Sequence, residues 1–276
     1  MDDLLRRLQL TQLEILRRID DFCREEKIAY SLYAGTLLGA VRHRGFIPWD
    51  DDLDVCMERS EYDRFIAAWT ERGPEGYSLQ NKDNTPRFTQ SFTKIRKDHT
   101  TFLQYDFERG RYHTGIFVDV FPIDRMPDSK LSRLGFTWDC LRYQLFCREF
   151  IPPKGNTVQK TVSLALLAAV PPEKRPDKRR ALLKKINRNN TGRGNTVAVE
   201  TFRTIRMPLP ADLLDDYVRL PFEDGEYMCF KNWDGYLNAK FGDYMSLPPE
   251  SERTWAHHPI VIDFEHNYGE LAPQRV

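Results

Sequence analysis

Hydrophobic positions recur along the chain at two spacings, and each spacing predicts one kind of element. Apolar residues three and four positions apart predict helices, whereas short apolar or alternating runs predict strands. Residues 129–188 follow a helical pattern that prolines interrupt at 151–153 and 171–172. Ser60 is the expected N-cap of one helix. That helix is expected at 61–72, and further helices at 3–27 and 37–42. Strands are expected at 28–32, 53–57, 89–96 and 116–122.

The pattern contains no internal repeat, and no linker of marked composition divides it into separate units. The chain has 276 residues, of which 41% are hydrophobic and 12% aromatic, and this is sufficient for one substantial core. We therefore predict a single globular domain over residues 1–276.

Charge is distributed unevenly, although the formal net charge is zero. Residues 171–206 contain eleven Lys and Arg against three Asp and Glu, so this stretch carries +8. One interpretation is a solvated basic helix face, which such runs usually form. The other is a surface that docks the protein on an anionic membrane, through residues such as Arg179, Arg180, Lys184 and Lys185.

The cysteines and the apolar segments indicate a cytoplasmic protein. The five cysteines are widely spaced without a Cys-x-x-Cys pair, which favours buried free thiols over a zinc site or disulfides. The N-terminus lacks the apolar core of a signal peptide. The longest apolar stretch, residues 162–170, has about half the length needed to span a bilayer. We expect a cytoplasmic location, with peripheral contact at the inner face of the membrane as an option.

An acidic run at Ile47–Val55 carries the clearest chemical signal, because four carboxylates in five positions stand between apolar residues. In a strand, Asp52 and Asp54 would share one face while Leu53 points to the other. Two adjacent carboxylates repel each other, and a hard divalent cation with oxygen ligands relieves this repulsion. The run therefore predicts a metal site for Mg²⁺, or alternatively Mn²⁺.

Two other interpretations of the acidic run fit less well. Asp50, Asp52, Asp54 and Glu61 fall at positions 1, 3, 5 and 12 of an EF-hand register, but Val55 stands where that loop requires Gly. A solvated acidic turn would have polar neighbours, and this run has apolar ones.

A lone carboxylate in a second apolar run completes the predicted site. Asp119 lies within Ile116–Pro122, with Phe117 and Phe121 on its face, and it is a candidate third metal ligand or general base. The structural alternative is a carboxylate satisfied by an Arg or by backbone N–H groups. Backbone and cationic groups suited to phosphate oxygens lie nearby in sequence. These candidates are Gly35, Thr36, Arg42, His43, Lys94 and Arg96.

The segment Tyr30–Val55 resembles the signature of the LicD family, whose members transfer phosphocholine from CDP-choline to glycans and are relatives of fukutin and fukutin-related protein. The resemblance spans almost the whole chain. Further matching segments are Thr93–Phe102, Gly115–Asp124 and Tyr236–Leu237 with Phe241–Glu250, followed by His257 or His258.

The resemblance implies an α+β, nucleotidyltransferase-like fold, a small mixed β-sheet surrounded by helices. It assigns the first and second catalytic carboxylates to Asp52 and Asp54, an accessory role to Asp50 and the third carboxylate to Asp119. Ala34 departs from the Gly that the family often has there. Residues 125–230, which resemble the family least, are expected to form a variable helical, basic insert that determines the acceptor. Additional site candidates are Trp49, His257 and His258.

The expected activity is Mg²⁺-dependent transfer of phosphocholine from CDP-choline to a hydroxyl of a cell-surface glycan. The acceptor would be a teichoic acid, lipopolysaccharide or capsule precursor, free or lipid-linked, and no nucleic-acid partner is expected. Alternative donors carry ribitol, glycerol, ethanolamine phosphate or aminoethylphosphonate on CDP or CMP. An aromatic cage would favour choline. Its candidates are Tyr33, Trp49, Tyr105, Phe107, Tyr112 and Trp233.

Two other function classes remain for comparison. A metal-dependent glycosyltransferase also uses Asp-x-Asp on a nucleotide-sugar, but it needs a nucleotide-binding half before that motif, and only about fifty residues precede it here. A non-catalytic phosphate-binding module would not need Asp119.

Overall fold

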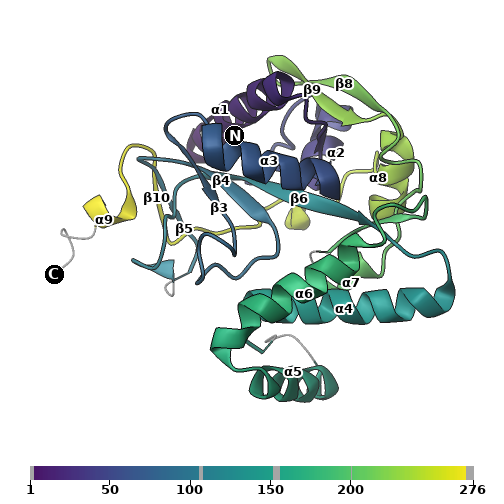
Figure 1. Cartoon of the computed structure of the whole chain (residues 1–276). Helices are drawn as coiled ribbons and strands as arrows, with labels where there is room; N and C mark the ends of the chain where they lie inside the picture. Colours follow the sequence, from purple (N-terminus) through teal and green to yellow (C-terminus); the bar gives the residue numbers. More distant parts are fainter. Residues whose placement is uncertain (1–2, 106–107, 152–155, 200, 272–276) are drawn as a thin grey trace.

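The structure, a computed structural model, describes the chain except for residues 1–2, 106–107, 152–155, 200 and 272–276. A mixed sheet forms its centre, with helices packed around it (Figure 1). The predicted α+β class, with a mixed sheet surrounded by helices, is confirmed. The principal helices are α1 (Asp3–Glu26), α2 (Ala34–His43), α3 (Arg59–Arg72), α4 (Lys130–Arg148), α5 (Thr157–Ala169), α6 (Arg175–Asn187) and α8 (Trp233–Phe241). The short helices are α7 (Phe202–Ile205) and α9 (Tyr268–Leu271).

The main sheet has the strand order β1-β2-β6-β4-β3, and β7 adds to the end of β6. Strand β2 is parallel to β6, and the other neighbours are antiparallel. The strands are β1 (Ser31–Leu32), β2 (Asp54–Glu58), β3 (Tyr77–Gln80), β4 (Thr93–Lys97), β6 (Phe117–Arg125) and β7 (Thr196–Ala198). Two further pairs are β5 (Thr101–Leu103) with β10 (Val261–Asp263), and the hairpin of β8 (Tyr217–Phe222) and β9 (Gly225–Phe230).

Strand β6 is the central strand, and every one of its nine residues is buried. This explains its near-continuous apolar sequence, because neither face of a strand covered on both sides contacts solvent, and polar residues are therefore not favoured on either face. The lone Asp119 is therefore buried by the fold, as the sequence pattern predicted.

The chain builds two hydrophobic clusters. The larger one joins α1, α2, α3 and α8 to the sheet and the β8–β9 hairpin. The smaller one draws its residues from Met126 to Ile205, mostly from α4, α6 and the segment around β7. Figure 1 shows α4, α5 and α6 gathered below the sheet, with α5 outermost. The helices interrupted by proline pairs were predicted correctly, and they form this helical layer.

Of two further local predictions, one is confirmed and one is wrong. The five cysteines are free and buried, as expected. Ser60 is not the N-cap of α3, because the helix begins at Arg59 after Glu58, and Glu58 makes no side-chain capping bond. No helix in the described part of the chain is long and apolar enough to cross a membrane.

A buried ion pair joins the start of α3 to the end of β6. Arg59 Nε and Nη2 lie 2.9 Å and 2.7 Å from the Asp124 carboxylate oxygens, and Asn190 Nδ2 donates to Asp124 Oδ1 over 2.8 Å. Both charged side chains are at most 4% exposed. Removing one member of such a pair leaves the other charge buried without its partner.

We expect Asp124→Ala to lower the free energy of unfolding by about 3–5 kcal/mol, the usual cost of breaking a buried pair. Chemical denaturation measures this change. Asp224→Ala, which removes the exposed partner of Arg17, is the matched control and should leave the unfolding midpoint nearly unchanged. Similar midpoints for the two variants would contradict a structural role for the buried pair.

Candidate active site

The strand register places three of the predicted site residues in one row across the sheet. Asp54 on β2 is in register with Asp119 on β6, and Asp119 is in register with Lys94 on β4. Gln80 on β3 continues the row beyond Lys94. Residues in register on neighbouring strands point to the same face, so these polar groups gather on one face of a buried sheet.

Asp119 and Lys94 form a buried ion pair. Lys94 Nζ lies 2.6 Å from Asp119 Oδ1 and 3.2 Å from the centre of the Phe117 ring. Burial lowers the pKa of the Lys94 ammonium, and the charge of Asp119 opposes this shift. The alternative interpretation of Asp119, a carboxylate satisfied by a basic side chain, is thus partly confirmed, with Lys94 in place of the expected Arg. A lysine that touches a central carboxylate is also well placed to meet a phosphate.

The acidic loop before β2 has a different geometry from the predicted one. Strand β2 begins at Asp54, so Asp52 precedes the strand, and the prediction that both share a strand face is wrong. The Asp52 carboxylate is instead hydrogen-bonded to the Asp50 side chain and lies close to the charges of Asp119 and Asp51. Burial, together with the neighbouring charge of Asp52, raises the pKa of Asp50 well above its usual range. Burial also raises the pKa of Asp52, against the opposing effect of His257.

Asp51 is a structural residue that the sequence analysis did not assign. Its carboxylate is buried and accepts hydrogen bonds from the backbone N–H groups of Ala256 (3.0 Å) and His257 (2.8 Å). These bonds hold the C-terminal segment against the acidic loop. As a result, His257 Nδ1 lies 3.4 Å from Asp51 Oδ1 and 3.6 Å from Asp52 Oδ2. The predicted candidate His257 is therefore at the site, whereas His258 is exposed.

The start of α2 supports the acidic loop from the other side. Thr36 Oγ1 accepts a hydrogen bond from the backbone N–H of Asp54 over 2.8 Å. A Cβ on Gly35 would lie only 2.6 Å from Asp50 Oδ2, so glycine is required for this close approach. The backbone N–H of Ala34 donates to the Tyr236 hydroxyl (3.1 Å), a contact that sequence reasoning missed. The predicted phosphate-binding role of the turn stays a prediction.

Arg42, His43 and Trp49 lie together in a separate cluster. Arg42 Nη1 donates to the carbonyl oxygens of Tyr244 (2.9 Å) and Ser246 (3.2 Å). The His43 and Trp49 rings meet edge to face at 6.3 Å. The structure thus gives Arg42 protein partners, and it does not bring this cluster into the carboxylate row.

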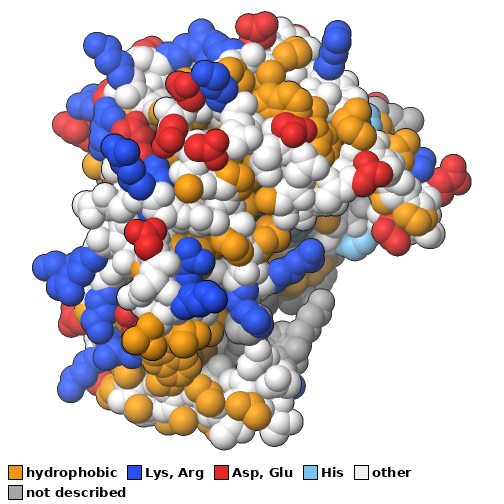
Figure 2. Space-filling view, turned by 90° about the vertical axis from the view of Figure 1, so that its right-hand side faces the viewer, with side chains coloured by type: hydrophobic (Ala, Val, Ile, Leu, Met, Phe, Trp, Pro, Cys, Tyr) orange, Lys and Arg blue, Asp and Glu red, His pale blue; other side chains and the backbone are white. Residues whose placement is uncertain are grey.

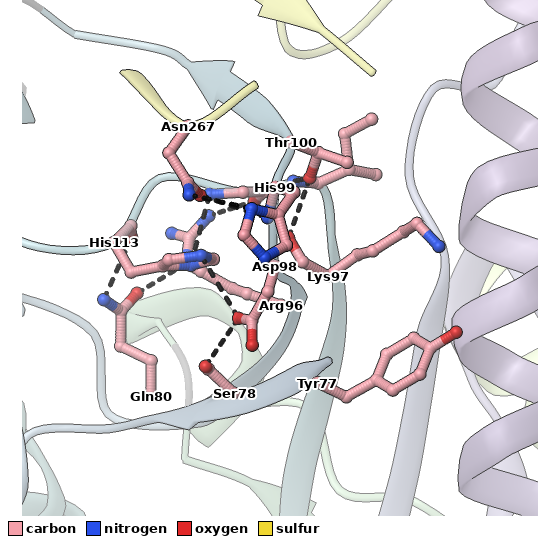
Figure 3. A network of polar contacts seen from close by, with 12 residues as sticks. Tyr77, Ser78, Gln80, Arg96, Lys97, Asp98, His99, Thr100, His113 and Asn267 are labelled. Atoms are coloured by element: carbon pink, nitrogen blue, oxygen red, sulfur yellow. Dashed lines mark hydrogen bonds and ion pairs between the residues drawn. The ribbon is translucent and has the colours of Figure 1, made fainter. Parts of the chain in front are cut away.

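Arg96 is the centre of a buried polar network on β4 (Figure 3). Its Nε donates to Gln80 Oε1 and its Nη1 to the carbonyl oxygen of Gly115, both over 2.6 Å. Burial lowers the pKa of the Arg96 guanidinium to about 10. In the same network, Asp98 accepts from Ser78 and lies 3.3 Å from His113 Nε2. Arg96 therefore supports Gln80 and the loop before β6.

The carboxylates of the acidic loop and β6 suit a divalent cation by their chemistry. Within the described residues, no three His, Cys, Asp or Glu side chains are already spaced to hold an ion. Several carboxylates nevertheless lie close together here, and the neighbouring negative charges of Asp52 and Asp51 contribute to the raised pKa of the half-buried Asp50. Oxygen ligands and uncompensated charge are what Mg²⁺ prefers in proteins.

Comparisons with known proteins identify the family of this chain. The model of the family described as "LicD/FKTN/FKRP, nucleotidyltransferase domain" matches residues 27–157. The chain is 30% identical over 275 residues to the "Lipopolysaccharide cholinephosphotransferase LicD" of Haemophilus influenzae, which covers 92% of this chain and 96% of that protein. It is also 44% identical over 72 residues to an uncharacterized protein of Rickettsia typhi, covering 26% of this chain and 23% of that protein.

These matches define the protein as an enzyme of the transferase class, one that moves a substituted phosphate group. The chain belongs to the LicD family. The resemblance seen in the sequence is thereby confirmed. The family-model match ends at residue 157, the first residue of α5.

Proposed function

We propose that the protein transfers phosphocholine from CDP-choline to a hydroxyl of a cell-surface glycan, with Mg²⁺ or Mn²⁺ as the metal. The observation that carries the proposal is the register of Asp54, Asp119 and Lys94 across three strands, beside the crowded Asp50 and Asp52. The name of the Haemophilus influenzae relative supports phosphocholine and a lipopolysaccharide acceptor. Teichoic acid and capsule precursors remain alternative acceptors.

The proposal extends to the fold and to the location of the enzyme. We infer a single nucleotidyltransferase-like domain over residues 1–276, with an acceptor-determining insert at about 125–230, which the family description and the separate helical cluster support. We infer that the enzyme works in the cytoplasm, at the inner face of the membrane, where a lipid-linked glycan would be accessible.

The carboxylates and Lys94 have different tasks in the proposed reaction. Asp52 and Asp54, with Asp119 and the accessory Asp50, would hold the metal, which polarises phosphate oxygens when bound. Asp119 orients the acceptor hydroxyl and accepts its proton as the hydroxyl oxygen bonds to phosphorus. The bond to CMP breaks, and CMP leaves with the electron pair. Lys94 offsets negative charge on the transferred phosphate.

Tyr33, a candidate for the choline cage, is buried beside this row. The backbone N–H of Tyr33 donates to the Asp54 carbonyl oxygen (2.9 Å), and the Tyr33 ring packs against Phe121 at 5.4 Å. The ammonium of Lys240 lies 4.3 Å from the centre of the Tyr33 ring, so this ring face already accommodates a cation. Among the other cage candidates, Phe107 lies outside the described residues.

A thermal-shift comparison of CDP-alcohols tests the donor. We expect CDP-choline to raise the melting temperature only when Mg²⁺ is present, because the acidic loop repels a diphosphate without it. A ligand at a hundred times its Kd stabilises the folded state by about 2.7 kcal/mol. CDP-ethanolamine, CDP-glycerol, CDP-ribitol and CMP-aminoethylphosphonate serve as competitors. A larger shift with one of these would replace choline, and a larger shift with UDP-glucose would favour a glycosyltransferase.

A further inference from the structure

The outer face of the helical layer is apolar and exposed. Helix α5 buries only Leu167 of its thirteen residues, and Val158 and Leu164 are 71% and 57% exposed. On α4, Leu131 and Leu134 are 80% and 70% exposed, and Trp138 continues the same stripe one turn later. Of the fifteen exposed large hydrophobic residues described, eight lie between residues 131 and 164, so they form a patch and are not scattered.

The segment that carries this patch is strongly basic. Residues 130–193 contain fifteen Lys and Arg against four Asp and Glu, so the segment carries +11 while the whole chain carries zero. Helix α5 itself contains one Lys and no acidic residue. Figure 2 shows hydrophobic side chains gathered at the lower end of the molecule, at the level of α4 and α5, with Lys and Arg side chains beside and above them.

The structure changes which basic residues are available. Arg179 is buried and forms an ion pair with Asp83, which joins α6 to the segment between β3 and β4. It therefore cannot belong to a docking surface, although the sequence pattern grouped it with Arg180. Lys178, Lys184 and Lys185 are exposed on α6.

We propose that the outer face of α4 and α5 docks on an anionic lipid bilayer, with α5 lying in the plane of the interface. Apolar side chains next to clustered Lys and Arg are the combination that binds such a surface. A second copy of this chain fits poorly, because two surfaces that both carry exposed Lys178, Lys184 and Lys185 repel each other. The described helices are too short or too polar to span the bilayer, so they would lie on it.

Vesicle co-sedimentation without donor or metal tests this surface separately from the transferase reaction. The wild type should sediment with vesicles containing phosphatidylglycerol at low salt, and only weakly with phosphatidylcholine alone. Leu131→Ser/Leu134→Ser/Val162→Ser should lose most of the bound fraction at every salt concentration. Lys178→Ser/Lys184→Ser/Lys185→Ser should weaken binding by about a hundredfold, because each nearby charge contributes about fivefold.

The matched control is Met245→Ser/Leu247→Ser, which removes exposed apolar residues outside the helical layer and should bind like the wild type. All substituted residues are exposed, so melting temperatures near that of the wild type are expected and confirm that each variant is folded. The proposal is overturned if the wild type fails to sediment with anionic vesicles at low salt, or if the apolar variant binds unchanged. The proposal is also overturned if the wild type does not bind vesicles but self-associates, and the apolar variant abolishes this self-association. That result would assign the patch to contact with a second copy of the chain.

Discussion

Replacing Asp119 with Asn is expected to lower kcat by a factor of about 10²–10⁴, the usual contribution of general acid–base catalysis. Asn keeps the size and one acceptor oxygen of the side chain, but it cannot take the proton of the acceptor hydroxyl. Donor binding should be largely retained, since Asp52 and Asp54 can hold a metal without Asp119. Steady-state kinetics gives the turnover, and calorimetry gives the affinity for CDP-choline.

The ion pair with Lys94 makes a stability control necessary. In the Asp119→Asn variant, the buried ammonium of Lys94 loses its charged partner 2.6 Å away, so the free energy of unfolding should fall by about 3 kcal/mol. The double variant Asp119→Asn/Lys94→Met removes both charges and should recover part of this stability, yet it should remain inactive. Equal losses of donor affinity and turnover in the single variant would show that Asp119 only holds the metal. Normal turnover would remove Asp119 from the mechanism.

Replacing Asp52 with Asn is expected to abolish turnover and the stabilisation by Mg²⁺ together. Without metal, the melting temperature should stay the same or rise, because the variant removes the Asp52 charge that raises the pKa of Asp50 and that lies close to Asp119 and Asp51. Asp54→Asn should also lose turnover. Melting curves with and without Mg²⁺, combined with a transfer assay, measure both effects.

Asp51→Ala is the contrasting control within the same acidic run. The Asp51 carboxylate accepts hydrogen bonds from the backbone N–H groups of Ala256 and His257. Removing this carboxylate should therefore destabilise the metal-free protein by about 1–3 kcal/mol. The variant should keep a stabilising response to Mg²⁺. If Asp52→Asn keeps both turnover and the Mg²⁺ response, the assignment of the metal site is wrong.

Much of the fold was predictable from local patterns. The helices α1, α4, α5 and α6, the proline breaks between them and the buried strand at Asp119 all follow from apolar spacing and from proline chemistry. The wrong predictions concern the first residues of a strand and of a helix, where a shift of one or two positions changes the role of a side chain. The start of β2 at Asp54 excluded Asp52 from the strand, and the start of α3 at Arg59 excluded Ser60 from capping. Backbone pairing and helix entry set such boundaries, and apolar spacing does not encode them.

By itself, the sequence determined the family, the acidic run and the presence of a buried carboxylate at Asp119. These features are contiguous or nearly so, which makes them readable from one segment at a time. Only the tertiary structure decided what each carboxylate touches. Lys94 reaches Asp119 across 25 residues, and His257 reaches Asp51 across 206. Such contacts depend on strand register and on how a distant segment folds back, and no local pattern of apolar and polar residues specifies either of them.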